Sequence, residues 1–284
     1  MEPVALRIRS LVHDTPLGRW RYSVMPPRPD LADAVECIWE VEGTQSYNRE
    51  KILPNGRVEL LFNLGAPHWL HEGGERRAYR DAWVSGLQER YLVIESPGRG
   101  AMMGARLRPL GAHRFFRLPM RELAGAIVDL DAVLGAWITA VTSRLRETAS
   151  TAGRFMILER LLTERLAAAP APDPGVAWAW SEIEGRDGKV RIEDLRAELR
   201  VSRKRLVDRF RQTVGLPPKA LARIRRFHVL AEALRPARRI DWAELALDYG
   251  YYDQSHLARD FHAFAGVTPR ELVAGRVPDG GLLA

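Results

Sequence analysis

An internal repeat constrains the fold of this chain more than any other feature. The stretch from Val201 to Leu272 holds two copies of one residue pattern, and the second copy lies 51 positions after the first. The matched pairs are Ser202 with Asp253, Leu206 with Leu257, Phe210 with Phe261, Gly215 with Gly266, Pro218 with Pro269, Lys219 with Arg270 and Leu221 with Leu272. Seven matches at one offset are difficult to obtain by chance, so we expect two copies of one structural unit.

The matched residue types predict what the unit looks like. Ser202 and Asp253 are typical N-cap residues, because their side-chain oxygens can accept hydrogen bonds from the free backbone amides of the first helical turn. Leucine and phenylalanine follow four and eight residues later, which places them on one face of a helix. Glycine then ends this helix, and proline precedes or opens the next one. Each unit is therefore predicted to consist of a helix that ends at glycine, followed by a second helix.

A shorter predicted helix precedes each N-cap. Residues 241–244 have the form of a capping box, and the apolar spacing of Leu245, Ala246 and Tyr249 predicts a helix that stops at Gly250. The next helix starts three residues later, which is the spacing of a helix-turn-helix. In the first copy, residues 192–199 supply the shorter helix. Between the copies, the spacing of the apolar residues in 218–234 predicts one long helix of about 25 Å at 1.5 Å per residue.

At these residues the chain resembles the AraC/XylS family of bacterial transcription regulators. The second unit matches the family signature at Leu245-Ala246, Gly250-Tyr251, residues 253–257, Arg259, Phe261 and residues 266–269. The first unit departs from the signature at Arg196, Arg200 and Asp208, where alanine, glycine and arginine are usual. The resemblance covers residues 176–275 and implies an all-α DNA-binding domain with two helix-turn-helix units joined by a long helix. It further implies a variable N-terminal sensing domain.

The resemblance also implies which side chains face DNA. Gln254 and Arg259 have the chemistry to pair with adenine and guanine in the major groove. The full set expected to face bases is Lys204, Arg205 and Asp208 in the first unit, with Gln254, Ser255, His256 and Arg259 in the second. The residues expected to contact phosphates are Ser202, Arg203, Arg209, Thr268 and Arg270.

The charge distribution agrees with a DNA partner. The chain has a formal net charge of +7, and residues 200–239 hold 13 basic residues but only two acidic ones. Such a run is often a solvated face. Because this run brackets a helix-turn-helix, neutralisation of phosphates is the better interpretation.

The first half of the chain has a different pattern. From Cys37 to residue 108, short alternating or apolar runs predict strands, and Pro54-Asn55-Gly56 predicts a turn. From residue 110 to 169 the periodicity becomes helical, and residues 167–174 form a proline-rich linker. We therefore expect an α+β chain, with a cupin-like barrel or sandwich plus helices in a sensing and dimerisation domain (1–170), followed by an all-α domain (176–284). The apolar helices of 110–169 are either a dimer contact or plain core.

The sensing half holds five tryptophans, which either line a pocket for a small-molecule effector or fill the core. The candidate effector residues are Trp39, Glu59, Trp69, Trp83 and Arg106, the two charged ones lying on otherwise apolar strands. The alternative function is a cupin-type metal enzyme fused to a DNA-binding module. It requires a cluster of histidine and carboxylate ligands, and His68 with His71 has the wrong spacing for one strand face. The sequence thus predicts no metal, no cofactor and no enzymatic activity.

The cysteine content and the hydropathy of the chain limit which other classes of protein it can belong to. A single cysteine, Cys37, excludes an internal disulfide, and its expected role is that of a small buried hydrophobe. No apolar run is long enough for a membrane span, and the N-terminus lacks a signal pattern. These features suit a cytoplasmic regulator whose main partner is double-stranded operator or promoter DNA. The resemblance allows RNA polymerase and a second copy of the chain as further partners.

Overall fold

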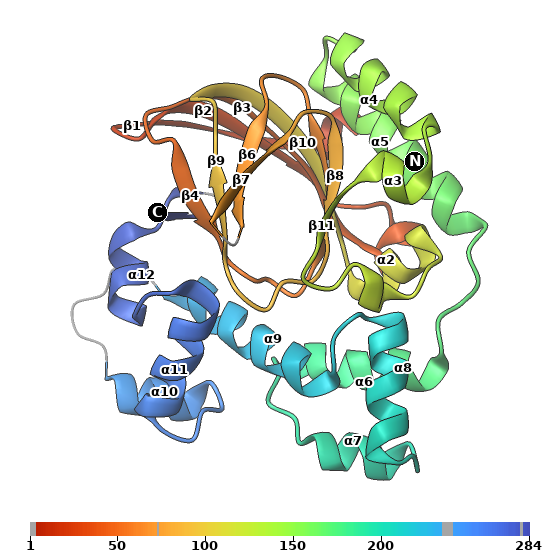
Figure 1. Cartoon of the computed structure of the whole chain (residues 1–284), viewed down its shortest axis with the longest axis vertical. Coiled ribbons are helices and arrows are strands. Elements are labelled where there is room, and N and C mark those ends of the chain that lie inside the picture. Colours follow the sequence, from red (N-terminus) through yellow and green to blue (C-terminus); the bar gives the residue numbers. More distant parts are fainter. Residues whose placement is uncertain (1–3, 73, 235–240, 279–280) are drawn as a thin grey trace.

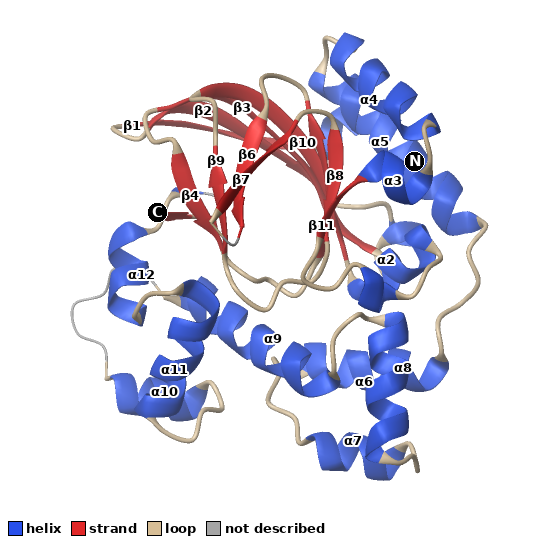
Figure 2. Ribbon diagram, viewed as in Figure 1, coloured by secondary structure: helices blue, strands red, loops and turns tan. Residues whose placement is uncertain are grey.

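The structure is a computed structural model that describes residues 4–72, 74–234, 241–278 and 281–284. Strands gather in the first half of the chain and helices in the second, as Figures 1 and 2 show. The predicted α+β class is confirmed, because two antiparallel sheets are followed by an all-helical region that ends in one short strand. Along the described parts of the chain, no helix has the length and apolar character needed to cross a membrane.

The two sheets form a sandwich. The larger sheet has seven strands in the order β1-β2-β3-β10-β5-β8-β11, and the smaller has five in the order β12-β4-β9-β6-β7. The strands are β1 (Arg9–Thr15), β2 (Gly18–Met25), β3 (Val35–Gln45), β4 (Arg49–Ile52), β5 (Val58–Asn63), β6 (His68–Glu72), β7 (Glu75–Tyr79), β8 (Ala82–Ser85), β9 (Leu92–Glu95), β10 (Arg99–Leu107), β11 (Ile127–Asp129) and β12 (Leu282–Leu283). The alternation predicted for residues 38–42 lies in β3, and the turn predicted at residues 54–56 precedes β5 with Gly56 at φ +71°.

Helices cover the outer face of the larger sheet (Figure 1). Ile38 and Leu60 on this face join one apolar core with Phe115, Phe155 and Leu158. The helices of this half are α1 (Val4–Arg7), η1 (Pro29–Leu31), α2 (Pro109–Phe116), η2 (Met120–Glu122), α3 (Leu130–Leu134), α4 (Trp137–Glu147) and α5 (Thr151–Ala167). The apolar stripes of α4 and α5 are therefore mostly core of this chain, and among their large apolar side chains Trp137 and Met156 stay exposed.

A second apolar cluster fills part of the space between the two sheets. Trp39, Leu61 and Trp83 come from the larger sheet, and Leu70 and Ile94 come from the smaller one. Because side chains alternate along a strand, β3 sends Trp39 into this space while its neighbour Ile38 faces the helices.

The C-terminal region contains the predicted repeat. Its helices are α6 (Pro174–Gly185), α7 (Ile192–Glu198), α8 (Arg203–Thr213), α9 (Pro218–Ala233), α10 (Trp242–Asp248), α11 (Gln254–Ala265) and α12 (Pro269–Gly275). The pair α7–α8 and the pair α10–α11 are the two units, and α9 is the long helix between them (Figure 1). Phe227 of α9 packs edge-on against Phe261 of α11, with ring centroids 5.0 Å apart.

Among the described residues, several contacts join the sandwich to the helical region, and three of them involve Arg57, Gly215 and β12. Buried Arg57, just before β5, forms ion pairs with Glu184 of α6 and with Glu36. The second place is Gly215 after α8, where an added Cβ atom would lie 2.9 Å from the Met120 carbonyl oxygen, so the two backbones approach closely. The third is β12, which pairs with β4 through Leu282 opposite Lys51.

The sequence predicts a division into domains 1–170 and 176–284. In the structure, β12 lies in the second of these ranges but forms a strand of the smaller sheet of the first.

Candidate nucleic-acid interface and internal cavity

The second helix-turn-helix unit is built by local capping. The Asp253 side chain accepts from the His256 amide at 2.6 Å and thereby starts α11. Before it, Gly250 at φ +76° ends α10, and the Tyr251 amide donates to the Ala246 carbonyl at 2.8 Å. Because only glycine adopts this left-handed conformation without steric cost, the sharp turn between the helices is set by the sequence.

One face of α11 is buried and the other is open. Leu257 and Phe261 are buried against α9 and the neighbouring helices. The opposite face is exposed, and it consists of Gln254, Ser255, Ala258, Arg259 and His262. Three of the four predicted base-facing residues of this unit, Gln254, Ser255 and Arg259, therefore lie together on one accessible helix surface.

His256, the fourth predicted residue, lies to the side of this face. Its Nδ1 atom accepts from the Tyr252 amide at 3.4 Å, and its ring stands edge-on to Tyr251 at 5.3 Å. The imidazole thus contacts the turn of the motif, and this contact fixes its orientation.

The first unit has the same plan with a different turn. The Ser202 hydroxyl accepts from the Arg205 amide at 3.2 Å and caps α8. Arg200 takes the left-handed conformation at φ +51°, at the position where the second unit has Gly250. The exposed face of α8 carries the predicted Arg203, Lys204 and Asp208, and Arg205 is exposed beside it.

Sequence reasoning missed the last turn of both exposed faces. Arg211 of α8 and His262 of α11 are exposed and lie three residues beyond Asp208 and Arg259. They match each other at the 51-residue offset, so the repeat itself was the signal that could have found them.

The basic run at residues 200–239 is not a uniform surface patch. Arg223 forms an ion pair with buried Asp260 at 2.6 Å, and Arg225 pairs with Asp187 at 2.7 Å. Arg226 donates to the Gly250 carbonyl at 2.8 Å. These three arginines of α9 connect helices within the protein, so the local charge excess overstates the number of cations that are open to phosphate.

The predicted phosphate contacts fall into two groups. Ser202, Arg203, Thr268 and Arg270 are exposed, and Thr268 also caps α12 through a reciprocal capping box with Glu271. Arg209 instead lies 3.5 Å from Asp173, the N-cap residue of α6, and is only partly exposed. Arg209 therefore already has an acidic partner inside the chain.

A cavity of about 880 Å³ lies between the sheets and opens toward α9 and the C-terminal tail. Trp39, Leu61, Trp83 and Ile94 are among its sandwich residues, and Phe227 and His228 of α9 close another side. From the tail and the end of α12 it is lined by Val273, Arg276, Val277, Pro278 and Gly281. Both halves of the chain thus form its wall.

Four of the five predicted effector residues line this cavity: Trp39, Glu59, Trp83 and Arg106. Glu59 accepts from Arg106 Nε at 2.6 Å and from the Trp39 indole nitrogen at 3.1 Å. Trp69 does not line the cavity. It lies on β6 with the Arg76 guanidinium 4.4 Å from its ring centre, because its neighbour Leu70 takes the inward position of the strand. The α9 and tail residues were missed because nothing in the sequence indicates that the tail returns to the sandwich.

Three buried groups in and around the cavity, Cys37, His68 and His228, have shifted pKa values. Burial raises the pKa of the Cys37 thiol to about 12, so the thiol is protonated at neutral pH, as expected of a buried hydrophobe. Burial lowers the pKa of His228 to about 4 and that of His68 to about 4, so both imidazoles are neutral at pH 7.

The histidines do not assemble a metal centre in the part of the chain that the structure describes, where no group of three or more metal-ligating side chains is found. His71 instead pairs with Glu95 at 2.8 Å on the smaller sheet.

Two family models match the chain. Residues 195–274 match a family described as a helix-turn-helix domain, and residues 23–129 match one described as a domain of unknown function (DUF6597). No curated protein matches the chain.

Among solved structures, the chain is similar to ToxT from Vibrio cholerae O395, with 11% identity over 95% of this chain and 98% of that one and a TM-score of 0.45. It is also similar to the C-terminal domain of AraT, a response regulator from Geobacillus stearothermophilus, with 24% identity over 37% of this chain and 88% of that one and a TM-score of 0.34. A third similar structure is that of the AraC-like transcriptional activator CuxR, with 13% identity over 81% of this chain and 88% of that one and a TM-score of 0.29.

The matched helix-turn-helix domain and its two exposed recognition faces define a DNA-binding protein. Residues 195–274 belong to a helix-turn-helix domain family, as the repeat predicted.

Proposed function

We propose that this chain is a sequence-specific regulator that reads one operator with both helix-turn-helix units and responds to a small molecule bound in the internal cavity. The observation that carries the first part is the placement of α8 and α11. Each offers one exposed polar face, and the 16-residue helix α9, about 24 Å long, joins their units. Helices held about one DNA turn apart can enter successive major grooves on one side of the duplex.

The two recognition faces have different chemistry. At matched positions α11 carries Arg259 and α8 carries Asp208. Arginine can bond bidentately to guanine, whereas aspartate accepts only, for instance from a cytosine amino group, and repels phosphate. We therefore assign most of the base-specific free energy to the second unit, through Gln254, Ser255 and Arg259. The first unit is anchored mainly by Arg203, Lys204 and Arg205.

The structural contacts refine two of the candidate residues. Since His256 already contacts the turn and Arg209 already pairs with Asp173, we assign them to positioning the recognition helices. Arg211 and His262 are added as contacts at the far end of each face. Such a regulator acts in the cytoplasm, where operator DNA and RNA polymerase are found.

The test of the central proposal is recovery of genomic fragments by the purified full chain, followed by titration of the best fragment against added salt. Specific binding should exceed binding to a scrambled duplex by 10³-fold or more. The logarithm of the binding constant should fall linearly with the logarithm of salt concentration, because phosphate neutralisation releases counterions. Equal affinity for both duplexes would contradict sequence-specific regulation.

Substitution of Arg259 by alanine is expected to cost about 1–3 kcal/mol of operator affinity and to relax specificity at one or two base pairs. Asp208→Ala should leave operator affinity equal or higher and raise affinity for scrambled DNA, because it removes a negative charge near the phosphates. Arg160→Ala, on the exposed side of α5, is the control for loss of a surface arginine. If Asp208→Ala is the more damaging change, the first unit reads bases and the assignment of roles is reversed.

The cavity supports the effector part of the proposal. Its volume of about 880 Å³ is within the range of small-molecule sites, and apolar side chains with a few polar groups line it. Phe227, which lines the cavity, also packs on Phe261 of the second recognition helix. A ligand that contacts α9 and the tail therefore has a direct path by which to bias the position of the second unit.

A further inference from the structure

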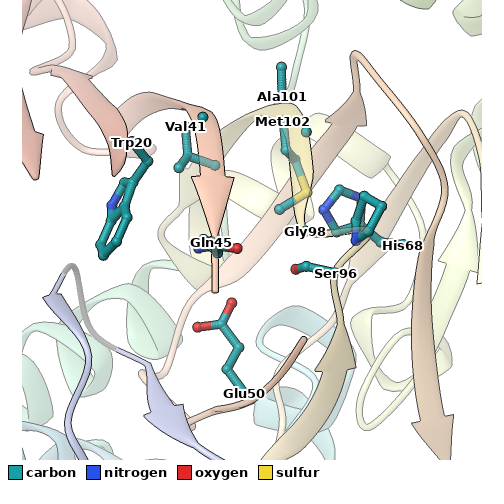
Figure 3. A pocket seen from close by; sticks show the side chains of 12 residues that line it. Trp20, Val41, Gln45, Glu50, His68, Ser96, Gly98, Ala101 and Met102 are labelled. Atoms are coloured by element: carbon teal, nitrogen blue, oxygen red, sulfur yellow. The ribbon is translucent and has the colours of Figure 1, made fainter. Parts of the chain in front are cut away.

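Charge is compensated inside the cavity of the protein but not at one corner of its surface. In the cavity wall, Glu59 pairs with Arg106, and Glu36 pairs with Arg57. Glu50 lies in a small chamber beside the cavity (Figure 3), and its side chain also interacts within the chain. One group of open charges lies instead where the sandwich meets the first helix-turn-helix unit.

Three arginines form this group, which we call the arginine patch: Arg117 at the end of α2, Arg121 of η2 and Arg165 near the end of α5. Arg117 donates to the Arg165 carbonyl at 2.9 Å, and Arg165 donates to the Phe115 carbonyl at 2.6 Å. In the described part of the chain, the hydrogen bonds of all three side chains go to carbonyl or amide oxygens, and no carboxylate pairs with them. Their positive charges are therefore not neutralised within the protein.

The surroundings of the patch are also poor in acidic residues. Residues 109–122 hold three arginines and a single acidic residue, Glu122. The pKa of Arg165 is lowered first by burial and then by the charge of Arg117, so these two guanidinium groups lie close enough to repel each other. Arg117 and Arg121 are exposed. A concentration of cations that the protein leaves open attracts an anionic partner.

The patch touches the first recognition helix beside its exposed face. Arg121 Nη1 donates to the side-chain oxygen of Gln212 in α8. Gln212 is exposed and lies four residues after Asp208, which places both on one side of the helix. Both α2 and η2 pack against α8, and the Met120 carbonyl closely approaches the backbone at Gly215. The arginine patch is therefore held next to the surface of α8 that we assign to DNA.

The nearest groups to a recognition helix in the major groove, apart from the bases, are phosphates. The two strands run along the edges of the groove, and arginines beside the helix contact them without reading the sequence. The first unit has more need of such cations, because its face carries acidic Asp208 where the second unit has Arg259. An acidic protein at Gln212 would have to share this space with the duplex, so the contact with α8 favours DNA as the partner.

Resting on the DNA-binding function proposed above, we propose that the arginine patch contacts the phosphate backbone of the operator beside the first helix-turn-helix unit. The contacts are made by exposed Arg117 and Arg121, and the Arg165 carbonyl holds the Arg117 side chain. The sandwich, and not only the helical repeat, thus contributes to the electrostatic part of DNA affinity.

The test uses the full-length protein and two duplexes of about 40 base pairs, roughly four helical turns. One is a genomic fragment recovered by the purified chain, and the other has a random sequence. Between about 50 and 200 mM KCl, the double variant Arg117→Gln with Arg121→Gln should bind both duplexes at least about tenfold more weakly. The slope of log affinity against log salt should become shallower by about 2, because each lost phosphate contact removes about 0.9. The ratio of the two affinities should not change, since phosphate contacts carry no sequence information.

Two further double variants separate charge from structure. Arg117→Lys with Arg121→Lys retains both charges and should retain the salt dependence of the wild type. Arg80→Gln with Arg144→Gln removes two exposed charges and should leave both affinities nearly unchanged. Arg144 lies on α4, which Figure 1 shows at the opposite end of the molecule from α8, and the Arg80 carbonyl accepts from Arg146 of the same helix.

The outcomes distinguish this inference from the function on which it rests. If the glutamine variant binds both duplexes with the affinity and slope of the wild type, the proposal is overturned, DNA binding by the repeat stands, and an acidic protein surface is left as the partner of the patch. A changed affinity ratio with an unchanged slope also overturns it, because Arg121 would then only position α8 through Gln212. If the wild type itself shows no salt-dependent binding to either duplex, the DNA-binding function fails together with this inference.

Discussion

Replacement of Phe261 by alanine is expected to destabilise the protein by about 3–5 kcal/mol, the typical cost of truncating a buried phenylalanine. The ring is fully buried and stands edge-on to Phe227 at 5.0 Å. Removing it leaves a cavity between the second recognition helix and the long helix, and the loss of packing lowers operator affinity as well. Urea unfolding followed by the helical circular dichroism signal measures the change.

Phe210 provides the matched test of the repeat. It occupies the corresponding place in the first unit, is equally buried, and should lose a similar free energy of unfolding when replaced by alanine. Tyr252→Ala is the control, because this aromatic residue of the second turn is 86% exposed and its removal should change stability by about 0.5 kcal/mol or less. A cost below about 1 kcal/mol for Phe261→Ala would mean that the repeat's apolar positions do not form the core described here.

Most of the helical region could be predicted because its signals are local. N-caps, the stop at Gly250 and apolar residues at helical spacing lie within a few positions of one another, so Asp253 and Phe261 could be given roles from the sequence. The first unit matched less well for a structural reason. Its turn is one residue shorter, so residues before the turn correspond at an offset of 50, with Arg200 opposite Gly250 in the left-handed conformation.

For the N-terminal half of the chain, the sequence predicts that strands form but not how they pair. Alternation in residues 38–42 indicates a half-buried strand, yet pairing joins strands that are far apart in the sequence, as β10 does with β3 and β5. The cavity illustrates the same limit. Glu59 and Arg106 were noticeable as charges on apolar strands, whereas Trp69 was assigned to the cavity by composition alone and lies outside it. No local pattern indicates that Leu282 pairs with β4.

Arg57 is the clearest case of a residue whose importance no local pattern shows. Its side chain is 5% exposed and lies between Glu36 of the sandwich and Glu184 of α6. Its guanidinium also stacks over Trp180, 5.5 Å from the ring centre. Glu184 in turn lies 3.3 Å from Arg225 of the long helix, so one ionic cluster connects the sandwich, α6 and α9.

Arg57→Met is expected to lower the free energy of unfolding by about 3 kcal/mol, because it leaves two partly buried carboxylates without their main partner. Arg90→Met, at an exposed loop position, should have little effect and serves as the control. The double variant Arg57→Met with Glu184→Met removes both charges and should recover part of the loss. A double variant no more stable than the sum of the two single changes would show that the pair is not coupled.

The cluster also predicts a dependence on pH. Burial alone would raise the pKa of the Glu36 carboxyl, but Arg57 and, more weakly, Arg106 and Arg108 hold that pKa below its ordinary value of 4.5. A carboxyl whose pKa is depressed on folding stabilises the protein above its unfolded pKa, and this contribution is lost as the pH falls through the folded one. The wild type should therefore lose stability relative to Arg57→Met as the pH is lowered below about 4.5, which urea titrations between pH 6 and pH 3 will measure. A constant difference between the two proteins across that range would mean that Arg57 stabilises the junction by packing on Trp180 and not by its charge.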